Sequence, residues 1–108
     1  MSIILNGIAA SPGIAEGTVR VVSGVADIAS FEEGDVLVAE LTEPSMVIMM
    51  NKAVAIVTDR GGITTHAAIV SRELGVPCVV STKTGTTDLK NGMRVRVDGS
   101  TGTVEVLE

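Results

Sequence analysis

The residues best suited to chemistry lie near the middle of the chain, where an apolar run leads into a glycine pair and then into a helical pattern. The pair is Gly61 and Gly62, two hydroxyl side chains follow at Thr64 and Thr65, and the only histidine of the chain is His66. A neutral imidazole can attack an electrophilic phosphorus atom without first losing a proton, and the product is a phosphohistidine. The pattern therefore makes His66 a candidate nucleophile for phosphoryl transfer.

The same segment offers a place for an anion. Glycines let the backbone bend closely and aim N–H groups into a concavity, and the first turn of a helix adds unsatisfied N–H donors with a partial positive charge. We expect a phosphoryl group to be bound by the backbone of Gly61, Gly62 and Ile63 and by the hydroxyls of Thr64 and Thr65.

Arg72 is the nearest cation on the predicted helix. It follows His66 by six positions, which places it about 9 Å along the helix axis and about 240° around it. The same phosphoryl group should therefore lie beyond its reach. Two roles remain open for Arg72, a favourable cation near a helix C-terminus and a docking residue.

Structural explanations compete with the chemical one. A glycine pair also forms tight strand-to-helix junctions, and a lone histidine is more often an ordinary core or surface residue. Two other functions fit the same residues, a non-catalytic swivelling adaptor and a module that reversibly binds small phosphorylated ligands at the helix N-terminus.

The surrounding pattern predicts a mixed α/β fold. Two helices are expected, residues 44–50 with Pro44 at the first position and residues 65–74 stopped by Gly75. Six short apolar runs predict strands at residues 17–22, 35–39, 53–58, 77–81, 94–98 and 103–107. The second and third runs hardly alternate and should be buried on both faces, whereas the last two alternate and should form a hairpin.

Composition limits the classes of partner. The chain has 108 residues, a net charge of −5 and a single aromatic residue, Phe31, so it lacks the basic surface and stacking platforms of a nucleic-acid binder. One compact domain without an internal boundary is expected. The single Cys78 excludes an internal disulfide, and with no membrane span or signal peptide we expect a cytoplasmic protein.

Sulfur-containing residues give weaker signals. Cys78 lies in an apolar run and should be buried and inert, and it forms no metal-ligand set with His66. Met46, Met49 and Met50 fit either a core or an adaptable docking surface, with the core favoured.

Residues 61–73, GGITTHAAIVSRE, resemble the active-site signature of the phosphoenolpyruvate-utilising enzymes. This family includes phosphoenolpyruvate synthase, pyruvate phosphate dikinase, enzyme I of the sugar phosphotransferase system and rifampicin phosphotransferase. Other segments resemble the family in order and spacing, namely residues 7–17, 34–39, 42–45, 74–80 and 92–104. The resemblance covers nearly the whole chain and implies that residues 1–108 form a swivelling β/β/α phosphohistidine domain.

The resemblance also implies roles for single residues. His66 matches the histidine that carries phosphoryl between remote sites, through Nε2, and Thr64 is similar to the family threonine two places earlier. Ser45 falls where some members place a hydroxyl or carboxylate that steadies the imidazole. A partner on one ring nitrogen would select the other as the nucleophile.

Partners are implied by what the chain lacks. The family's enzymes carry an ATP-grasp domain, a phosphoenolpyruvate- or pyruvate-binding barrel, or both, and 108 residues leave room for neither. We therefore expect no cofactor on this domain itself, with Mg²⁺ and ATP or phosphoenolpyruvate bound by partner domains or subunits. The chain is either a separate subunit, which Met1 favours, or a domain of a larger enzyme. The final phosphoryl acceptor stays open.

Overall fold

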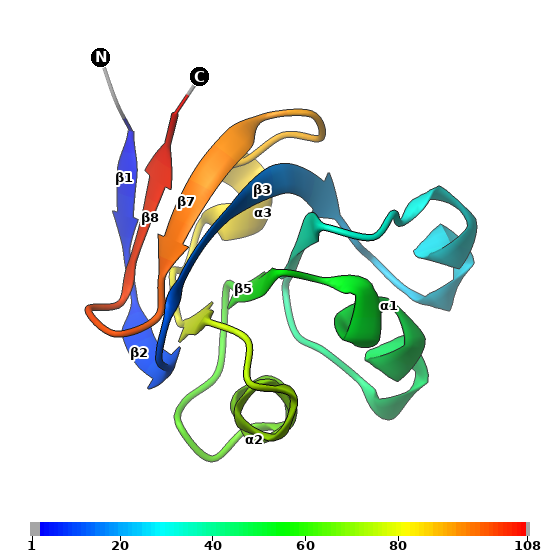
Figure 1. The fold of residues 1–108 in the computed structure, drawn as a ribbon, viewed down its shortest axis with the longest axis horizontal. Coiled ribbons are helices and arrows are strands. Elements are labelled where there is room, and N and C mark those ends of the chain that lie inside the picture. The colour runs from blue at the N-terminus through cyan, green and yellow to red at the C-terminus, as the bar shows by residue number, and fades with distance from the viewer. Residues whose placement is uncertain (1–2, 108) are drawn as a thin grey trace.

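A single eight-stranded mixed sheet organises residues 3–107, the part of the chain that the computed structural model describes (Figure 1). The strands are β1 (Ile4–Asn6), β2 (Ile8–Ser11), β3 (Ile14–Val21), β4 (Asp35–Ala39), β5 (Ala55–Thr58), β6 (Cys78–Val80), β7 (Arg94–Asp98) and β8 (Thr103–Val106). Their order across the sheet is β1-β8-β7-β3-β4-β5-β6-β2. β3, β4, β5 and β6 run parallel to one another, and every other pairing is antiparallel.

The two outer strands of this sheet are consecutive in the chain. β1 and β2 pair at opposite edges and only Gly7 separates them, so the sheet curls until its edges meet at that residue. The Gly7 N–H donates a hydrogen bond of 2.8 Å to the Gly102 carbonyl. A Cβ atom at Gly7 would collide with the carbonyl oxygen of Val80, and a residue without a side chain is therefore required at this junction.

Helical segments cover one face of the parallel strands. They are η1 (Val25–Ser30), η2 (Pro44–Met46), α1 (Val47–Lys52) and α2 (His66–Leu74). The short helix α3 (Gly85–Asp88) lies on a different side of the sheet. One hydrophobic core lies between the helices and the sheet and includes Leu37, Met49 and Ile56. A second core fills the interior of the curled sheet and includes Val38 and Val97. The chain thus forms two β layers and one helical layer.

Alternate residues of the central strands point into different cores. In β4, Val36 and Val38 belong to the interior core, whereas Leu37 and Ala39 belong to the helical one. Burial on both faces explains why this strand shows no apolar-polar alternation in the sequence. The β7–β8 hairpin behaves differently, since its four valines are buried and Arg94 and Arg96 are exposed.

The predicted mixed α/β class is confirmed. Each of the six predicted runs overlaps a strand of the structure, and the helix predicted at residues 65–74 is α2. The helix expected at residues 44–50 is divided into η2 and α1, and Met46, Met49 and Met50 lie in the core as favoured. Four elements have no counterpart in the sequence prediction, namely β1, β2, η1 and α3.

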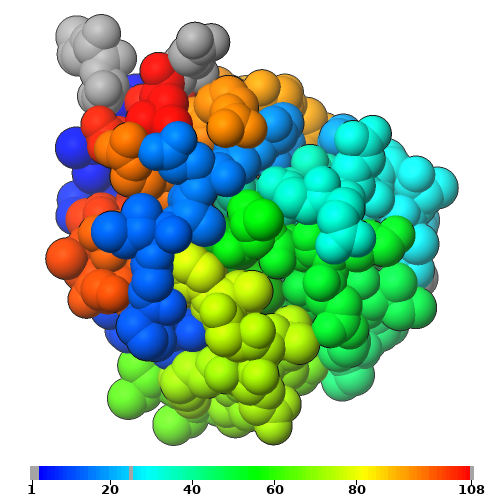
Figure 2. Space-filling view, in the orientation of Figure 1, coloured from blue at the N-terminus to red at the C-terminus, as the bar shows by residue number. Residues whose placement is uncertain are grey.

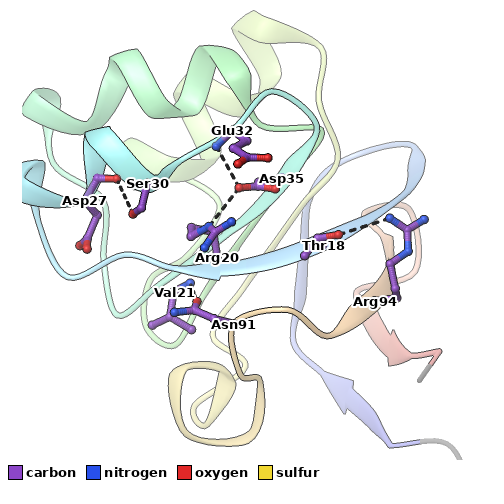
Figure 3. A network of polar contacts seen from close by, with 9 residues as sticks. All are labelled: Thr18, Arg20, Val21, Asp27, Ser30, Glu32, Asp35, Asn91 and Arg94. Carbon is purple, nitrogen blue, oxygen red and sulfur yellow. Dashed lines mark hydrogen bonds and ion pairs between the residues drawn. The ribbon is translucent and has the colours of Figure 1, made fainter.

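A polar cluster joins β3 to β4 away from the helices' N-termini (Figure 3). The Arg20 guanidinium lies 3.1 Å from the Asp35 carboxylate, whose side chain is only 8% exposed. The same carboxylate oxygen accepts a 2.9 Å hydrogen bond from the Glu32 N–H. Both charges are therefore compensated within the chain, as a buried carboxylate requires.

Candidate functional site

His66 is the first residue of α2, at the edge of the sheet where the parallel strands end. The loop that carries it leaves β5 at Thr58, next to the segment that leaves β4 at Ala39. Pairing continues past both strands, because the Arg60 N–H donates a 3.1 Å hydrogen bond to the Glu40 carbonyl. Ligands of open α/β sheets bind at the carboxyl ends of the strands, which is where this loop lies.

The glycine pair contains one residue that must be glycine and one that need not be. Gly61 has φ +119°, and a Cβ there would lie 3.0 Å from the Thr65 hydroxyl oxygen. Gly62 has open space around its Cα, with nothing within 4 Å of a Cβ. The left-handed conformation of Gly61 turns the chain from β5 toward α2. Gly62 places no side chain over the surface of the loop.

Thr65 fixes the last turn before the helix. Its N–H and its hydroxyl both donate to the Gly62 carbonyl, at 3.2 and 2.7 Å. The hydroxyl proton is therefore used within the loop, and Thr65 contributes the shape of this turn rather than a free donor. The predicted hydroxyl donor that stays exposed is Thr64, and Ile63 beside it is also exposed.

The first turn of α2 has no side-chain cap. Thr65 occupies the N-cap position, but its hydroxyl points back to Gly62 instead of forward to the helix. The first N–H groups of an α-helix have no partner within the helix, and they carry the positive end of its dipole. His66 thus stands beside donors that an anion can use.

Thr42 is the hydrogen-bond partner of the imidazole. Its Oγ1 lies 2.8 Å from Nδ1 of His66, and both side chains are partly buried. The family resemblance implies Ser45 as the partner of the imidazole, but Ser45 lies exposed in η2 and the structure gives the bond to Thr42. The physical reason is position, since Thr42 is in the segment that follows β4, beside the loop that follows β5.

Nε2 is the nitrogen left for chemistry. When Nδ1 carries the proton and donates it to Thr42, the lone pair of the neutral ring is on Nε2. In that tautomer the contact with Thr42 occupies Nδ1, and the lone pair lies on Nε2. Thr42 and Ser45 both closely follow the predicted strand 35–39, and carboxyl ends of parallel strands meet at one edge, so the sequence points to this segment without choosing between the two hydroxyls.

Arg72 reaches the loop without facing the histidine. Its Nη2 donates a 2.7 Å hydrogen bond to the Ile63 carbonyl, and its Nη1 donates a 2.8 Å bond to the Ala10 carbonyl in β2. Figure 2 shows the yellow-green surface of α2 directly beside the blue surface of the N-terminal segment. Neither of the two roles left open for Arg72 from the sequence included this bridge.

An open depression of about 620 Å³ lies on the other side of Thr42. Its lining includes Thr42, the carboxylates of Glu40 and Glu43, and the end of β3, but not His66. The Arg60 guanidinium lies 3.5 Å from Glu40, and both of these side chains are largely exposed. The imidazole is therefore not part of the lining of this depression.

Other reactive groups offer no second centre within residues 3–107. Burial raises the pKa of the Cys78 thiol from an ordinary 9.0 to about 11, so the thiol stays protonated and unreactive, as predicted. No three His, Cys, Asp or Glu side chains in the described part of the chain come together as a metal site. None of the helices between residues 3 and 107 has the length and apolar character needed to cross a bilayer.

Comparison with known proteins finds a matching family model and similar chains. A family model described as PEP-utilising enzyme, mobile domain, matches residues 31–102, which include Thr42 and His66. The chain is 59% identical over 102 residues to a probable phosphoenolpyruvate synthase of Archaeoglobus fulgidus, covering 94% of this chain and 14% of that protein. It is 57% identical to the phosphoenolpyruvate synthase of Pyrococcus furiosus, covering 94% of this chain and 12% of that one. The chain therefore spans about an eighth of the length of these relatives.

Solved structures share the fold. An Enzyme I structure determined by solution NMR is 36% identical, with a TM-score of 0.64 over 78% of this chain and 34% of that one. The holo form of aconitase X from Thermococcus kodakaraensis has a TM-score of 0.74 at 24% identity, over 98% of this chain and 99% of that one. At that identity the second likeness concerns the fold alone.

Proposed function

Because the chain belongs to the mobile-domain family of the phosphoenolpyruvate-utilising enzymes, we propose that it is a phosphoryl carrier that is transiently phosphorylated on His66. The group would come from one active site and be passed to another, in chemistry that connects phosphoenolpyruvate, pyruvate and ATP. The sequence supports this because the residues that form the phosphohistidine signature, 61–73, are the loop and helix described above.

The observation that carries the proposal is the contact between Thr42 and Nδ1 of His66 at 2.8 Å. Most partly buried imidazoles have a hydrogen-bond partner. A nucleophile needs that partner on the nitrogen that does not react, because the reacting nitrogen must keep its lone pair while the other one keeps its proton. The contact also fixes the ring plane, so that Nε2 can align with the bond that breaks.

The proposed step moves one phosphoryl group and no proton. The Nε2 lone pair forms a bond to phosphorus while the bond from phosphorus to the donor's leaving oxygen breaks, and that oxygen departs with the electron pair. The Nδ1 proton stays on the ring, shared with Thr42. Attack by the acceptor's oxygen then reverses the sequence and restores the neutral imidazole.

The proposed seat stabilises the carried group by dipoles instead of by a close cation. The uncapped first turn of α2 and the exposed Thr64 hydroxyl supply donors. Gly61 and Thr65 shape the turn, and open Gly62 leaves the approach uncovered. Weak stabilisation suits a carrier, which must also release its phosphoryl group.

Two active sites are needed besides this chain, and the proposal assigns them to partner domains or subunits. The relatives are roughly eight times longer, which leaves room for nucleotide-binding and phosphoenolpyruvate-binding domains. Those partners would supply Mg²⁺ and the cationic groups that activate the donor. The whole reaction is thus shared between this domain and the rest of the assembly.

The test is intact mass measured at alkaline pH, where phosphohistidine survives. Wild type and His66→Ala are incubated with phosphoenolpyruvate or ATP and an extract that contains the native partners. We expect an acid-labile phosphate adduct on wild type only, and a His66→Ala chain that unfolds at the wild-type temperature. Phosphate on His66→Ala, or no adduct on wild type in an extract whose own phosphotransfer is shown to work, contradicts the proposal and favours a non-catalytic adaptor.

A further inference from the structure

We propose that Arg72 is a positioning residue for phosphoryl transfer, acting through the backbone of the loop that precedes His66. The inference rests on the function proposed above and adds a residue that does not touch the histidine. Arg72 would hold the peptide between Ile63 and Thr64 in the one orientation that an anionic group tolerates.

The starting observation is a bridge between two backbone carbonyls. The guanidinium of Arg72 donates to Ile63 at 2.7 Å and to Ala10 at 2.8 Å. Ala10 is buried in β2, which is paired with β6, so this end of the bridge is anchored in the sheet. A planar guanidinium presents its donors in a fixed fork, and it can therefore hold two acceptors at a set distance from each other.

The bridge determines which way the loop peptide faces. In a trans peptide the carbonyl and the following N–H point in opposite directions, and no cis peptide occurs among the described residues. With the Ile63 carbonyl directed to Arg72, the Thr64 N–H points away from Arg72. His66 and Arg72 lie about 240° apart around α2, so we infer that the bond to Arg72 turns the Ile63 carbonyl away from the histidine.

The preceding carbonyl is held as well. Gly62 accepts both the N–H and the hydroxyl of Thr65. The carbonyls of Gly62 and Ile63 are therefore both occupied by donors of the chain, and neither is free to face a phosphoryl group. A loop whose carbonyls are tied back in this way can offer its remaining N–H groups to an anion.

Release of the Ile63 carbonyl would reverse this polarity. Gly61 and Gly62 precede this peptide and make the loop easy to rotate, so the loop needs an external contact to stay in one orientation. A rotated peptide would direct a carbonyl dipole at the incoming phosphoryl oxygens and repel them.

Arg72 also keeps its charge uncompensated. Within residues 3–107 the ion pairs join Arg20, Arg60 and Arg96 to carboxylates, and none involves Arg72. Its two acceptors are neutral carbonyls. The guanidinium therefore adds a positive potential behind the loop, transmitted through the Ile63 carbonyl.

The test compares Arg72→Met, which removes both donors at similar length, with Arg72→Lys, which keeps the charge without the fork. Arg60→Met is the matched control, because Arg60 lies in the same loop, is 67% exposed and pairs only with exposed Glu40. Each full 108-residue chain is incubated with phosphoramidate, a small donor that needs no partner protein. The adduct is followed by intact mass at alkaline pH, and the Thr64 amide by ¹H–¹⁵N NMR.

We expect the phosphorylation rate of Arg72→Met to fall by about tenfold or more, and that of Arg72→Lys by about threefold. Arg60→Met should stay within about twofold of wild type. Phosphorylation should shift the Thr64 amide strongly in wild type and in Arg60→Met, but weakly in Arg72→Met. A merely structural role for Arg72 would lower the melting temperature without changing this spectroscopic response.

The outcomes separate this inference from the proposed function. If wild type forms the adduct while Arg72→Met matches Arg60→Met in rate and in the Thr64 shift, the role of Arg72 is overturned and the carrier function stands. If wild type never forms an adduct with phosphoramidate or with the native partners, both fall. Should Arg72→Met fail to fold, Arg72→Lys decides, and a wild-type rate in that variant overturns the inference.

Discussion

The Arg20–Asp35 cluster and the His66 loop both place polar groups beside neighbouring parallel strands. They differ in whether those polar groups have hydrogen-bond or ion-pair partners within the chain. In the cluster, the Asp35 carboxylate receives the Arg20 guanidinium at 3.1 Å and the Glu32 N–H at 2.9 Å (Figure 3). At the loop, the carbonyls are occupied, but the first turn of α2 is uncapped.

The difference separates a structural use of polarity from a functional one. A buried charge whose donors come from the chain itself contributes to folding and has nothing left to offer a ligand. N–H groups at a helix start without an internal acceptor are held ready for an anion from outside. The two arginines follow the same division, since Arg20 pairs with a carboxylate and Arg72 bonds two neutral carbonyls.

Removal of the Asp35 carboxylate should have the largest effect on stability. Asp35→Ala leaves the three-quarters-buried Arg20 side chain without its counter-charge, and loss of one partner of such a pair costs about 4 kcal/mol. Urea unfolding measures the change. Glu16→Ala is the control, because it removes a carboxylate from a half-exposed pair with Arg96 and should hardly alter stability. Equal losses in the two variants would contradict the structural role, as would a slower phosphorylation of folded Asp35→Ala.

Gly61→Ala should cost less stability but should disturb the site. Alanine at φ +119° is strained, and its Cβ would lie 3.0 Å from the Thr65 hydroxyl oxygen. This strain should lower the free energy of unfolding by about 2 kcal/mol. The displaced Thr65 would loosen its bond to Gly62, and the phosphorylation rate should fall. Gly62→Ala serves as the neighbouring control and should melt like wild type, because nothing lies within 4 Å of the added Cβ. A reversed order of the two melting temperatures would show that the loop has another conformation.

Thr42→Val should cost about 1 kcal/mol of stability, less than the two changes above, and slow the chemistry. Valine keeps the shape of threonine but cannot accept a hydrogen bond from Nδ1. A loss of about 1.4 kcal/mol of transition-state stabilisation corresponds to a rate about tenfold lower. Thr42→Ser retains the oxygen and should react at close to the wild-type rate. Ser45→Ala tests the alternative suggested by the sequence. Normal phosphorylation of Thr42→Val together with slow phosphorylation of Ser45→Ala would transfer the orienting role to Ser45.

The sequence predicts the centre of the fold better than its edges. β4 and β5 are visible because their residues are buried on both faces, and α2 because it runs from a threonine to a left-handed glycine at Gly75. β1 and β2 contain three and four residues, and they exist through pairing with β8 and β6, far along the chain. No local pattern of that length predicts a strand whose partners are so distant.

The candidate site divides in the same way. His66 and the glycines are adjacent in sequence, so the loop could be predicted directly. Thr42 and Ser45 are two hydroxyls three positions apart, and only the path of the chain between β4 and η2 decides which one meets Nδ1. Helix geometry predicts that Arg72 lies away from the histidine, but the return of the loop toward its guanidinium depends on the bend at Gly61.

The most direct measurement of the central claim is a long-range ¹H–¹⁵N NMR spectrum of the phosphorylated chain with ¹⁵N-labelled histidine. His66 is the only histidine, so the spectrum contains a single ring. The account predicts phosphate on Nε2, with the proton on Nδ1 in its contact with Thr42. Phosphate on Nδ1, or an adduct on any residue other than His66, would contradict it.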